Sequence, residues 1–338
     1  MKIDSPTSIV ERLDGVDYLA DDGLATALFL AIELGQPLLL EGEPGVGKTA
    51  AAKAMAEALE APFVRLQCYE GLTASEALYE WNYQRQLLAI RLAESRGQEL
   101  ADADLFTEEF LLQRPILRCV RHQGPVPPVL LIDEIDRADD EFEALLLEFL
   151  GEASITIPEL GTFAAVQAPV VVLTSNRSRE LHDALKRRCL YHWIDFPAPE
   201  RAAAIVRRNV PSGSEALIAK ATDFVGRLRT LDLDKAPGLA ETIDWVAALA
   251  ALGAADLTSE DALRTMGSVL KTPDDLLLAR NSVDDLLGPG GRGTPVATGN
   301  ETATDQTTED QRAKNPGIAG EAAPGGGVLR PRDADGAG

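Results

Sequence analysis

A run of eight residues near the start of the chain has the residue types and the spacing that bind the phosphates of a nucleotide. It matches the pattern G-x-x-x-x-G-K-[ST] and consists of Gly42, Glu43, Pro44, Gly45, Val46, Gly47, Lys48 and Thr49. Glycines let backbone N–H groups converge on phosphates, and a helix that follows points its positive end at them. We expect Lys48 to reach the β- and γ-phosphates and the Thr49 hydroxyl to ligate Mg²⁺. The complete match between an apolar run and a helical pattern favours a phosphate-binding loop over a chance glycine-rich turn.

Two adjacent carboxylates, Asp133 and Glu134, follow the apolar run at residues 129–132. An acid at the end of a buried strand holds Mg²⁺ in P-loop NTPases, and we expect Asp133 to do so through the water shell of the ion. Glu134 is adjacent and points elsewhere, which makes it the natural base to orient an attacking water. Alone, two acids could simply end a strand and begin the acidic stretch that continues to residue 143. The phosphate loop upstream favours the catalytic interpretation.

A second strand pattern, at residues 170–175, is followed by Asn176. If this strand lies between the loop strand and the acid strand, Asn176 lies beside the γ-phosphate and the water, although such residues also end strands in ordinary turns. Residues 186–188, Lys-Arg-Arg, end a helical pattern that begins near residue 178. A guanidinium supplied to a neighbour's γ-phosphate stabilises the charge of the transition state. Cations at the end of a helix are also favoured by its dipole alone.

Short apolar runs alternate with helical patterns through the first two hundred residues. The predicted strands are residues 37–40, 62–66, 129–132 and 170–173, with a helix at residues 49–60. Continuous Val/Leu/Ile runs separated by helices are typical of a parallel sheet that is buried on both faces. Two β-leaning stretches, residues 155–158 and 161–166, predict a hairpin inserted before the fourth strand. From residue 199 to 287 strand patterns disappear and apolar spacing predicts amphipathic helices.

These patterns divide the chain into three parts. Residues 1–198 are predicted to form an α/β nucleotide-binding domain, and residues 199–287 a small all-α lid domain. Residues 289–338 hold 11 of the 28 glycines, 5 of the 20 prolines and no aromatic residue. Such a segment cannot bury enough apolar surface to offset the entropy of ordering. We therefore expect a disordered Gly/Pro-rich tail over residues 288–338.

The charge of the chain narrows the classes of partner. Its 54 acidic and 32 basic residues give a net charge of −22, which disfavours a general binder of nucleic acid or of anionic membranes. No apolar stretch approaches the roughly 20 residues of a membrane span, and residues 1–15 lack the apolar centre of a secretory signal. We expect a cytoplasmic protein with no membrane insertion.

Cysteines and histidines are scattered, without a disulfide or zinc pattern, at Cys68, Cys119, Cys189, His122, His182 and His192. We expect Cys68 and Cys119 to be buried and the histidines to be surface or helix-end residues.

Aromatic residues gather in one short segment, at Tyr69, Tyr79, Trp81 and Tyr83. They could grip a client segment, since aromatic side chains anchor interfaces at low entropic cost. We favour the alternative that they pack a helix against the sheet, because aromatic side chains dominate core energetics.

Together these residues resemble the AAA+ ATPases, and more closely their MoxR family. The sequence DEIDRA at residues 133–138 is similar to the acidic motif of that family, as are the helix and hairpin at residues 145–160. Residues 69–91 resemble the MoxR branch that contains CoxD-like proteins of carbon monoxide dehydrogenase maturation. The resemblance covers residues 10–285. It implies a P-loop NTPase (AAA+) fold, with a parallel sheet, flanking helices and an inserted β-hairpin.

The resemblance also implies roles for particular residues. Asn176 would be the sensor-1 residue, Arg188 the best match for the arginine finger, and Arg187 the second match. The subunits would form a ring, usually of six, because each finger serves a neighbour's nucleotide. Family members act as ATP-driven chaperones that mature metalloenzymes, frequently with a partner that carries a von Willebrand A domain. AAA+ lids commonly offer a sensor-2 arginine where residues 237–242 of this chain contain none.

The leading hypothesis is therefore a Mg²⁺-dependent ATPase that remodels a protein client in metalloenzyme maturation. A first alternative is an AAA+ motor subunit that acts on nucleic acid, against which the acidic charge and the lack of a basic stripe argue. A second alternative is a nucleotide-switched scaffold without turnover. The presence of Lys48 and Glu134 argues against this scaffold, and the missing sensor-2 arginine leaves it slightly open.

Overall fold

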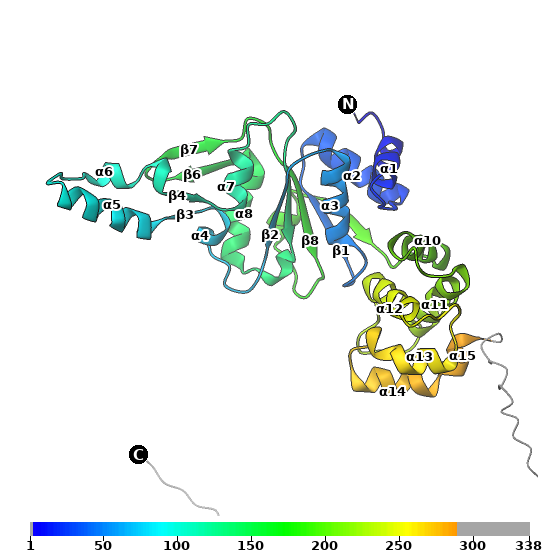
Figure 1. The fold of residues 1–338 in the computed structure, drawn as a ribbon. Coiled ribbons are helices and arrows are strands. Elements are labelled where there is room, and N and C mark those ends of the chain that lie inside the picture. Colours follow the sequence, from blue (N-terminus) through cyan, green and yellow to red (C-terminus); the bar gives the residue numbers. More distant parts are fainter. Residues whose placement is uncertain (1–2, 289–338) are drawn as a thin grey trace, which may run out of the picture. The chain divides into compact units, whose positions relative to one another are not determined.

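The computed structural model describes residues 3–288, and a five-stranded parallel sheet lies at its centre (Figure 1). The strands follow the order β2–β5–β8–β1–β9, and every neighbouring pair is parallel. They are β1 (Leu38–Gly42), β2 (Phe63–Gln67), β5 (Val129–Asp133), β8 (Val170–Ser175) and β9 (Leu190–Ile194). The predicted parallel sheet is confirmed, and β8 lies between the loop strand β1 and the acid strand β5.

Strand β9 is the one strand of this sheet that the sequence patterns miss. Its sequence, LYHWI, is not a continuous aliphatic run. It lies at the sheet edge and pairs with β1 alone, from Leu38 opposite Leu190 to Gly42 opposite Ile194. An edge strand has a neighbour on one side only, so it tolerates polar and aromatic side chains that a central strand of a buried sheet excludes.

Alternate side chains of the central strands enter two separate hydrophobic cores. In β5, Val129 and Leu131 join one core, and Leu130 and Ile132 join the other. This follows from the period of two in a strand, which sends successive side chains to opposite faces. The first core contains residues of α1 (Pro6–Asp14), α2 (Asp22–Leu34) and α3 (Lys48–Ala58), and the second contains residues of α7 (Pro115–Val120) and α8 (Asp140–Glu152).

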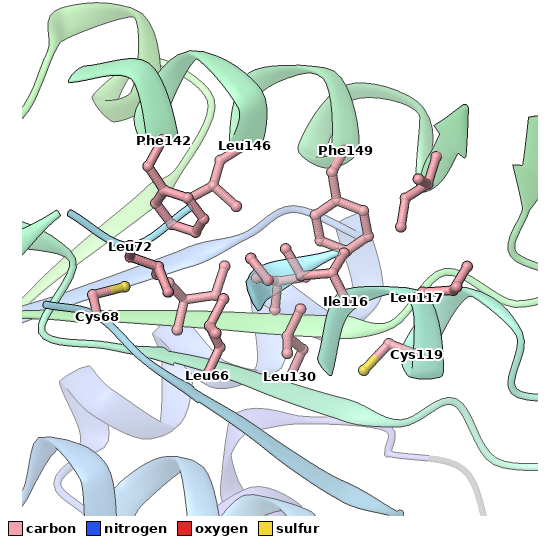
Figure 2. Close-up of a cluster of buried hydrophobic side chains, with 14 of the residues drawn as sticks. Leu66, Cys68, Leu72, Ile116, Leu117, Cys119, Leu130, Phe142, Leu146 and Phe149 are labelled. Carbon is pink, nitrogen blue, oxygen red and sulfur yellow. The ribbon is translucent and has the colours of Figure 1, made fainter. Parts of the chain in front are cut away.

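Helix α8 shows how the sequence builds the second core (Figure 2). Asp139 caps the helix by accepting a hydrogen bond from the N–H of Phe142 at 2.9 Å. Phe142, Leu146 and Phe149 then recur at helical spacing, and each is at most 3% exposed. Burial of such side chains contributes about 1.5–3 kcal/mol each, so this face of α8 holds the helix on the sheet.

Two cysteines lie in this same core, as the sequence predicts (Figure 2). Cys68 and Cys119 are buried and free. Burial raises the pKa of each thiol to about 12, so both side chains stay protonated and act as small apolar groups.

An inserted segment between β2 and α7 carries most of the aromatic residues singled out in the sequence. It consists of α4 (Ala74–Ala77), β3 (Tyr79–Trp81), α5 (Tyr83–Ser95), α6 (Asp102–Leu105), a 3-10 turn (Glu108–Phe110) and β4 (Leu111–Gln113). Strands β3 and β4 pair in antiparallel fashion. Trp81 is 6% exposed and meets the ring of Phe106 edge-on at 5.2 Å. The core-packing prediction holds for Trp81 and is wrong for Tyr69 and Tyr83, which are 40% and 61% exposed.

The predicted hairpin is confirmed as β6 (Ser154–Ile157) and β7 (Gly161–Ala164), which precede β8. A 3-10 turn (Ile135–Arg137) joins β5 to α8. The helix predicted from residue 178 is shorter than expected, since α9 spans only Asp183–Lys186. Ser178 donates from both its backbone N–H and its hydroxyl to Asp136, and this interaction holds the chain outside the helix.

The C-terminal part of the described chain is helical, as predicted. It contains α10 (Pro199–Asn209), α11 (Glu215–Leu228), α12 (Leu239–Ala251), α13 (Ser259–Thr265), a 3-10 turn (Met266–Ser268), α14 (Pro273–Asn281) and α15 (Val283–Leu287). These helices share a core around Trp245, which packs against Phe224 at 5.2 Å and donates to the Thr265 hydroxyl at 2.7 Å. The predicted tail, from residue 289 onward, lies outside the described residues. Within residues 3–288, no helix is both long and apolar enough to cross a membrane.

Candidate active site

The phosphate-loop residues connect β1 to α3 at the carboxyl end of the sheet. Gly47 caps α3 with a φ of 100°, a backbone conformation that is unfavourable for residues other than glycine. Lys48 is the first residue of the helix and is 7% exposed. Its ammonium donates to the carbonyl oxygens of Gly42 at 2.7 Å and Glu43 at 2.8 Å. Burial lowers the pKa of Lys48 below its ordinary value, and nearby carboxylates oppose that shift. The Lys48 ammonium is therefore a desolvated cation that is bound to carbonyl groups of the phosphate loop itself.

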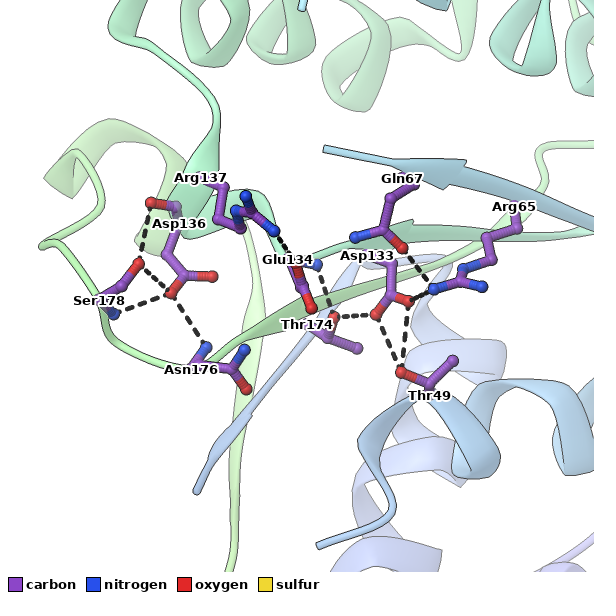
Figure 3. Close-up of polar contacts among 10 residues, drawn as sticks. All are labelled: Thr49, Arg65, Gln67, Asp133, Glu134, Asp136, Arg137, Thr174, Asn176 and Ser178. Atoms are coloured by element: carbon purple, nitrogen blue, oxygen red, sulfur yellow. Dashed lines mark hydrogen bonds and ion pairs between the residues drawn. The ribbon is translucent and has the colours of Figure 1, made fainter. Parts of the chain in front are cut away.

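Asp133 is the buried centre of a hydrogen-bond cluster (Figure 3). Its carboxylate accepts from the Thr49 hydroxyl at 3.0 Å and from the Thr174 hydroxyl at 2.5 Å. Arg65, on β2, forms an ion pair with the same carboxylate and also donates to Gln67. A hydroxyl and a carboxylate that lie together are hard oxygen donors, the ligand type that Mg²⁺ prefers. The donor set of Thr49 and Asp133 therefore fits a magnesium ion.

Glu134 adopts a left-handed backbone conformation, with φ 56° and ψ 50°. Its N–H donates to the Thr174 hydroxyl at 2.9 Å, which ties the backbone of Glu134 to β8. The carboxylate accepts from Arg137 at 3.0 Å, and its side chain is 33% exposed. A non-glycine residue in this region costs about 1–3 kcal/mol and persists where the surroundings impose it. The strained turn separates the direction of the Glu134 side chain from that of Asp133.

Asp136 connects the acid turn to the residues that follow β8 (Figure 3). It is 2% exposed. Its carboxylate accepts from the N–H of Asn176 at 3.2 Å, and from the N–H and hydroxyl of Ser178 at 2.8 and 2.7 Å. These bonds fix the backbone of Asn176 relative to Glu134. The second carboxylate oxygen of Asp136 has no hydrogen-bond partner within residues 3–288.

A cavity of about 940 Å³ opens over these groups. Its wall includes Lys48, Thr49, Asp133, Glu134 and Asn176. Four further predicted loop residues, Pro44, Gly45, Val46 and Gly47, line the same cavity, so the structure brings together nine predicted residues that lie as far as 132 positions apart (176 minus 44). A partly apolar hollow of this size with a few convergent polar groups is typical of a nucleotide or cofactor site.

His192 corrects one sequence expectation. It is neither a surface nor a helix-end residue, because it lies on β9 with an 18% exposed side chain and lines the cavity. Burial lowers the pKa of His192, although the carboxylates of Asp21 and Asp195 oppose the shift. The imidazole is therefore neutral at physiological pH. His182 does begin a helix, α9, as expected.

The C-terminal helices contact the phosphate loop directly. The carbonyl oxygen of Gly45 accepts from the N–H groups of Leu239 at 3.0 Å and Ala240 at 3.2 Å, at the start of α12. Gly238 fits here because it has no side chain: a Cβ atom would lie 2.7 Å from the carbonyl oxygen of Pro44. The start of α12 therefore meets the loop through backbone groups, where AAA+ lids commonly offer an arginine.

Two arginines from other helices lie near the position that lacks the sensor-2 arginine. Arg201, on α10, lines the cavity and donates to Asp21 at 3.1 Å and to the Leu19 carbonyl at 2.9 Å. Arg229, which ends α11, forms an ion pair with Glu43 of the loop and lies 4.2 Å from the ring centre of Phe196. Both are cations that the C-terminal helices present to the loop region.

The two finger candidates lie elsewhere on the molecule. Arg188 is exposed and donates to the carbonyl oxygen of Leu147 on α8. Arg187 is also exposed, and within residues 3–288 its side chain has no hydrogen bond or ion pair. Neither residue lines the cavity of its own chain.

The sequence analysis misses four residues of the site: Arg65, Thr174, Arg201 and Arg229. Thr174 had a signal, since it ends the same strand as Asn176. The register of β5 and β8, with Ile132 opposite Leu173, brings Thr174 to Asp133. The arginines carried no local signal, because their partners lie far away in sequence.

Residues 37–189 match the family described as AAA domain (dynein-related subfamily). This range holds the loop, both acids and Asn176. Chaperone MoxR1 of Mycobacterium tuberculosis is 25% identical over 198 residues, which cover 56% of this chain and 44% of MoxR1. Residues 37–189 of the chain are an AAA domain. This AAA domain accounts for the sheet order, the phosphate loop and the acid pair together.

Two further similarities each cover only part of the other protein. Lon protease of Mycolicibacterium smegmatis is 32% identical over 146 residues, which cover 41% of this chain and 16% of that protein. A mutant of RuvB from Thermotoga maritima covers 75% of this chain and 69% of its own, with 20% identity and a TM-score of 0.44. The chain spans 16% and 44% of the lengths of Lon protease and MoxR1. The domain assignment therefore rests on the AAA match and on the site, and not on the whole length of any relative.

Proposed function

We propose that the chain hydrolyses ATP in a Mg²⁺-dependent reaction at the cavity described above. One observation carries this proposal: Thr49, Asp133, Glu134 and Asn176 converge at the carboxyl ends of three adjacent strands, beside the phosphate loop. Ligands of open α/β sheets bind at this edge. Phosphoryl transfer needs positioning and charge stabilisation more than covalent chemistry, and these groups are suited to supply both.

Each residue has a role that follows from its chemistry. The loop N–H groups and Lys48 bind the phosphates of ATP, and Thr49 and Asp133 hold Mg²⁺. When bound, Mg²⁺ neutralises charge on the phosphate oxygens. Glu134 orients the attacking water and accepts its proton, since its carboxylate points away from Asp133. Asn176 faces the same cavity and is placed to contact the γ-phosphate or the water.

The exposed Arg188 supports assembly into a ring, usually of six subunits in this family. Because Arg188 does not line its own cavity, it can act as an arginine finger only at a neighbour's nucleotide. Arg187 is the second candidate for the same role. A finger supplied from a neighbouring subunit makes hydrolysis depend on assembly.

The energy of hydrolysis would remodel a protein client, as the similarity to a MoxR chaperone suggests. The residues that resemble the CoxD-like branch make a metalloenzyme such as carbon monoxide dehydrogenase the first client to examine. A partner with a von Willebrand A domain and a cytoplasmic location belong to the same proposal.

Client capture tests this proposal. The Glu134→Gln variant is expected to bind ATP and to hydrolyse it slowly, so a client should copurify from the native host with ATP and be absent with ADP. Lys48→Ala is the matched control, because it should bind neither ATP nor client. A metalloenzyme subunit or a von Willebrand A protein in the captured fraction supports the chaperone function. Nuclease subunits or bound DNA would contradict it.

A further inference from the structure

A second hollow lies between the inserted segment and the hairpin, away from the nucleotide cavity. It measures about 650 Å³, and its lining residues come from α4, β3, the start of α5, α8, β6 and the turn that follows β6. None of its lining residues also lines the nucleotide cavity. We call it the hairpin groove.

The floor and walls of the hairpin groove are largely apolar and aromatic. Phe149 and Ile155 line it with 2% and 3% exposure and belong to the second core. Tyr79 and Tyr83 stand at its β3 side, and the Tyr83 side chain is 61% exposed. A rigid floor with exposed aromatic side chains can hold an apolar group at low entropic cost.

The rim of the hairpin groove is acidic. Three glutamates line it, Glu80, Glu148 and Glu159, and no lysine, arginine or histidine does. Glu80 is neutralised by an ion pair with Arg114. Glu148 and Glu159 are exposed, and neither forms an ion pair within residues 3–288. Burial raises the pKa of Tyr79, and the charge of Glu159 adds to that shift.

This combination selects a class of ligand. An anionic ligand such as nucleic acid would be repelled by the two unpaired carboxylates. The described residues contain no group of three or more potential metal ligands that could hold a cation. A ligand with a cationic side chain next to an apolar group matches both the acidic rim and the apolar floor.

We propose that the hairpin groove binds an extended segment of a protein client that carries a lysine or arginine beside an aliphatic or aromatic side chain. The choice of a client as the occupant rests on the proposed chaperone function. The cation pairs with Glu148 and Glu159, and the neighbouring side chain packs on Phe149 between Tyr79 and Tyr83.

Peptide binding to the full chain tests this proposal. The probe is a fluorescein-labelled glycine–serine peptide that bears lysine and leucine side chains, and its control is the same peptide with glutamine in place of lysine. Fluorescence anisotropy is expected to show about tenfold tighter binding of the lysine peptide, equivalent to about 1.4 kcal/mol. Added salt should reduce the difference, because salt screens exposed charges.

Variants locate the binding. Glu148→Gln with Glu159→Gln should remove the preference for lysine, whereas Glu141→Gln, an exposed acid two turns earlier on α8 and outside the groove, should leave it unchanged. Equal binding of the two peptides, or a preference that survives the double variant, overturns the proposal. Binding that appears only after deletion of residues 294–338 would assign the groove to the chain's own C-terminal segment and also overturn it.

The result of the peptide-binding test does not depend on ATP hydrolysis at the nucleotide cavity. ATP hydrolysis is measured on the same preparations, and the double variant should retain it. Intact ATP hydrolysis without a preference for the lysine peptide would refute client binding at the hairpin groove and would leave the proposed ATPase activity supported. Lysine preference without hydrolysis refutes the ATPase and supports the groove.

Discussion

The nucleotide cavity and the hairpin groove are built in opposite ways. In the cavity, polar side chains are bonded to one another around a buried carboxylate: Asp133 is 2% exposed and accepts from Thr49, Thr174 and Arg65. In the groove, Glu148 and Glu159 are exposed and unpaired within the described residues. The cavity groups are held in one geometry, as chemistry requires. The groove groups are free to adapt, which suits ligands of varied sequence.

The same contrast predicts how much a single substitution should matter. Removal of one member of a buried, bonded set leaves its partners unsatisfied, whereas removal of an exposed side chain leaves little behind. Arg188 is the exception, because an exposed finger would act on the reaction at a neighbour's cavity. The other effects expected below fall from the residues of the cavity to the surface of the groove.

The largest effect is expected for Arg188→Ala. An arginine finger contributes roughly 10³–10⁵ in kcat, so hydrolysis should fall by about 1000-fold in assembled rings. Arg187→Ala removes the same charge one residue away and serves as the matched control. Steady-state phosphate release, with ring assembly checked by light scattering, measures both. A loss of hydrolysis in Arg187→Ala and not in Arg188→Ala would identify Arg187 as the arginine finger instead.

Lys48→Ala is expected to come next. The ammonium is buried and hydrogen-bonded to the loop, and truncation of a buried charged contact costs about 2–5 kcal/mol. ATP binding measured by calorimetry should weaken by at least about 100-fold. Tight binding retained by this variant would refute the phosphate-loop assignment.

Asp136→Ala tests the link between the acid turn and Asn176. Its loss leaves the N–H groups of Asn176 and Ser178 without their acceptor, at a cost of about 1–3 kcal/mol for a buried donor. Hydrolysis should fall by about 10–100-fold, as for other residues that orient catalytic groups. Glu141→Ala removes an exposed acid that has no hydrogen bond or ion pair of its side chain within residues 3–288, and it should leave both the free energy of unfolding and the rate of hydrolysis unchanged. Chemical denaturation measures the free energy of unfolding, and phosphate release measures the rate of hydrolysis. Wild-type hydrolysis by Asp136→Ala would show that the position of Asn176 does not affect catalysis.

The smallest effect is expected for Tyr83→Ala in the groove. Its side chain is 61% exposed, so the free energy of unfolding should change by less than about 0.5 kcal/mol. ATP hydrolysis should stay at the wild-type level. A large loss of stability of Tyr83→Ala in thermal unfolding would mean that Tyr83 belongs to the hydrophobic core. The hairpin groove would then be as tightly packed as the nucleotide cavity, contrary to the comparison above.

The sequence was sufficient to predict the parts of the cavity that chemistry dictates. The loop, the acids at the end of β5 and Asn176 are residue types that a phosphate chain, a metal ion and a water would need, and the structure places members of each group at one cavity. The four buried strands were visible as apolar runs for the same reason, because a sheet covered on both faces admits little else. Strand β9 was not visible, since an edge strand with Tyr191, His192 and Trp193 has no such run.

The remaining features depend on contacts between distant parts of the chain. Arg65 reaches Asp133 because the register of β2 and β5 sets Gln67 opposite Asp133, and no local pattern displays a register. Arg229 reaches Glu43 across 186 positions. The hairpin groove arises where an inserted segment and a hairpin meet α8, so its acids looked like ordinary solvated charges in the sequence.

We expect ATP hydrolysis at the cavity to depend on Glu134, and the Glu134→Gln variant isolates the contribution of its carboxylate. Substitution by the amide keeps the size of the side chain and removes its capacity to take a proton. We predict that phosphate release falls by at least about 100-fold, the contribution of a positioned base, while calorimetry shows ATP affinity unchanged. Wild-type hydrolysis by Glu134→Gln, with ATP bound as before, would contradict the account.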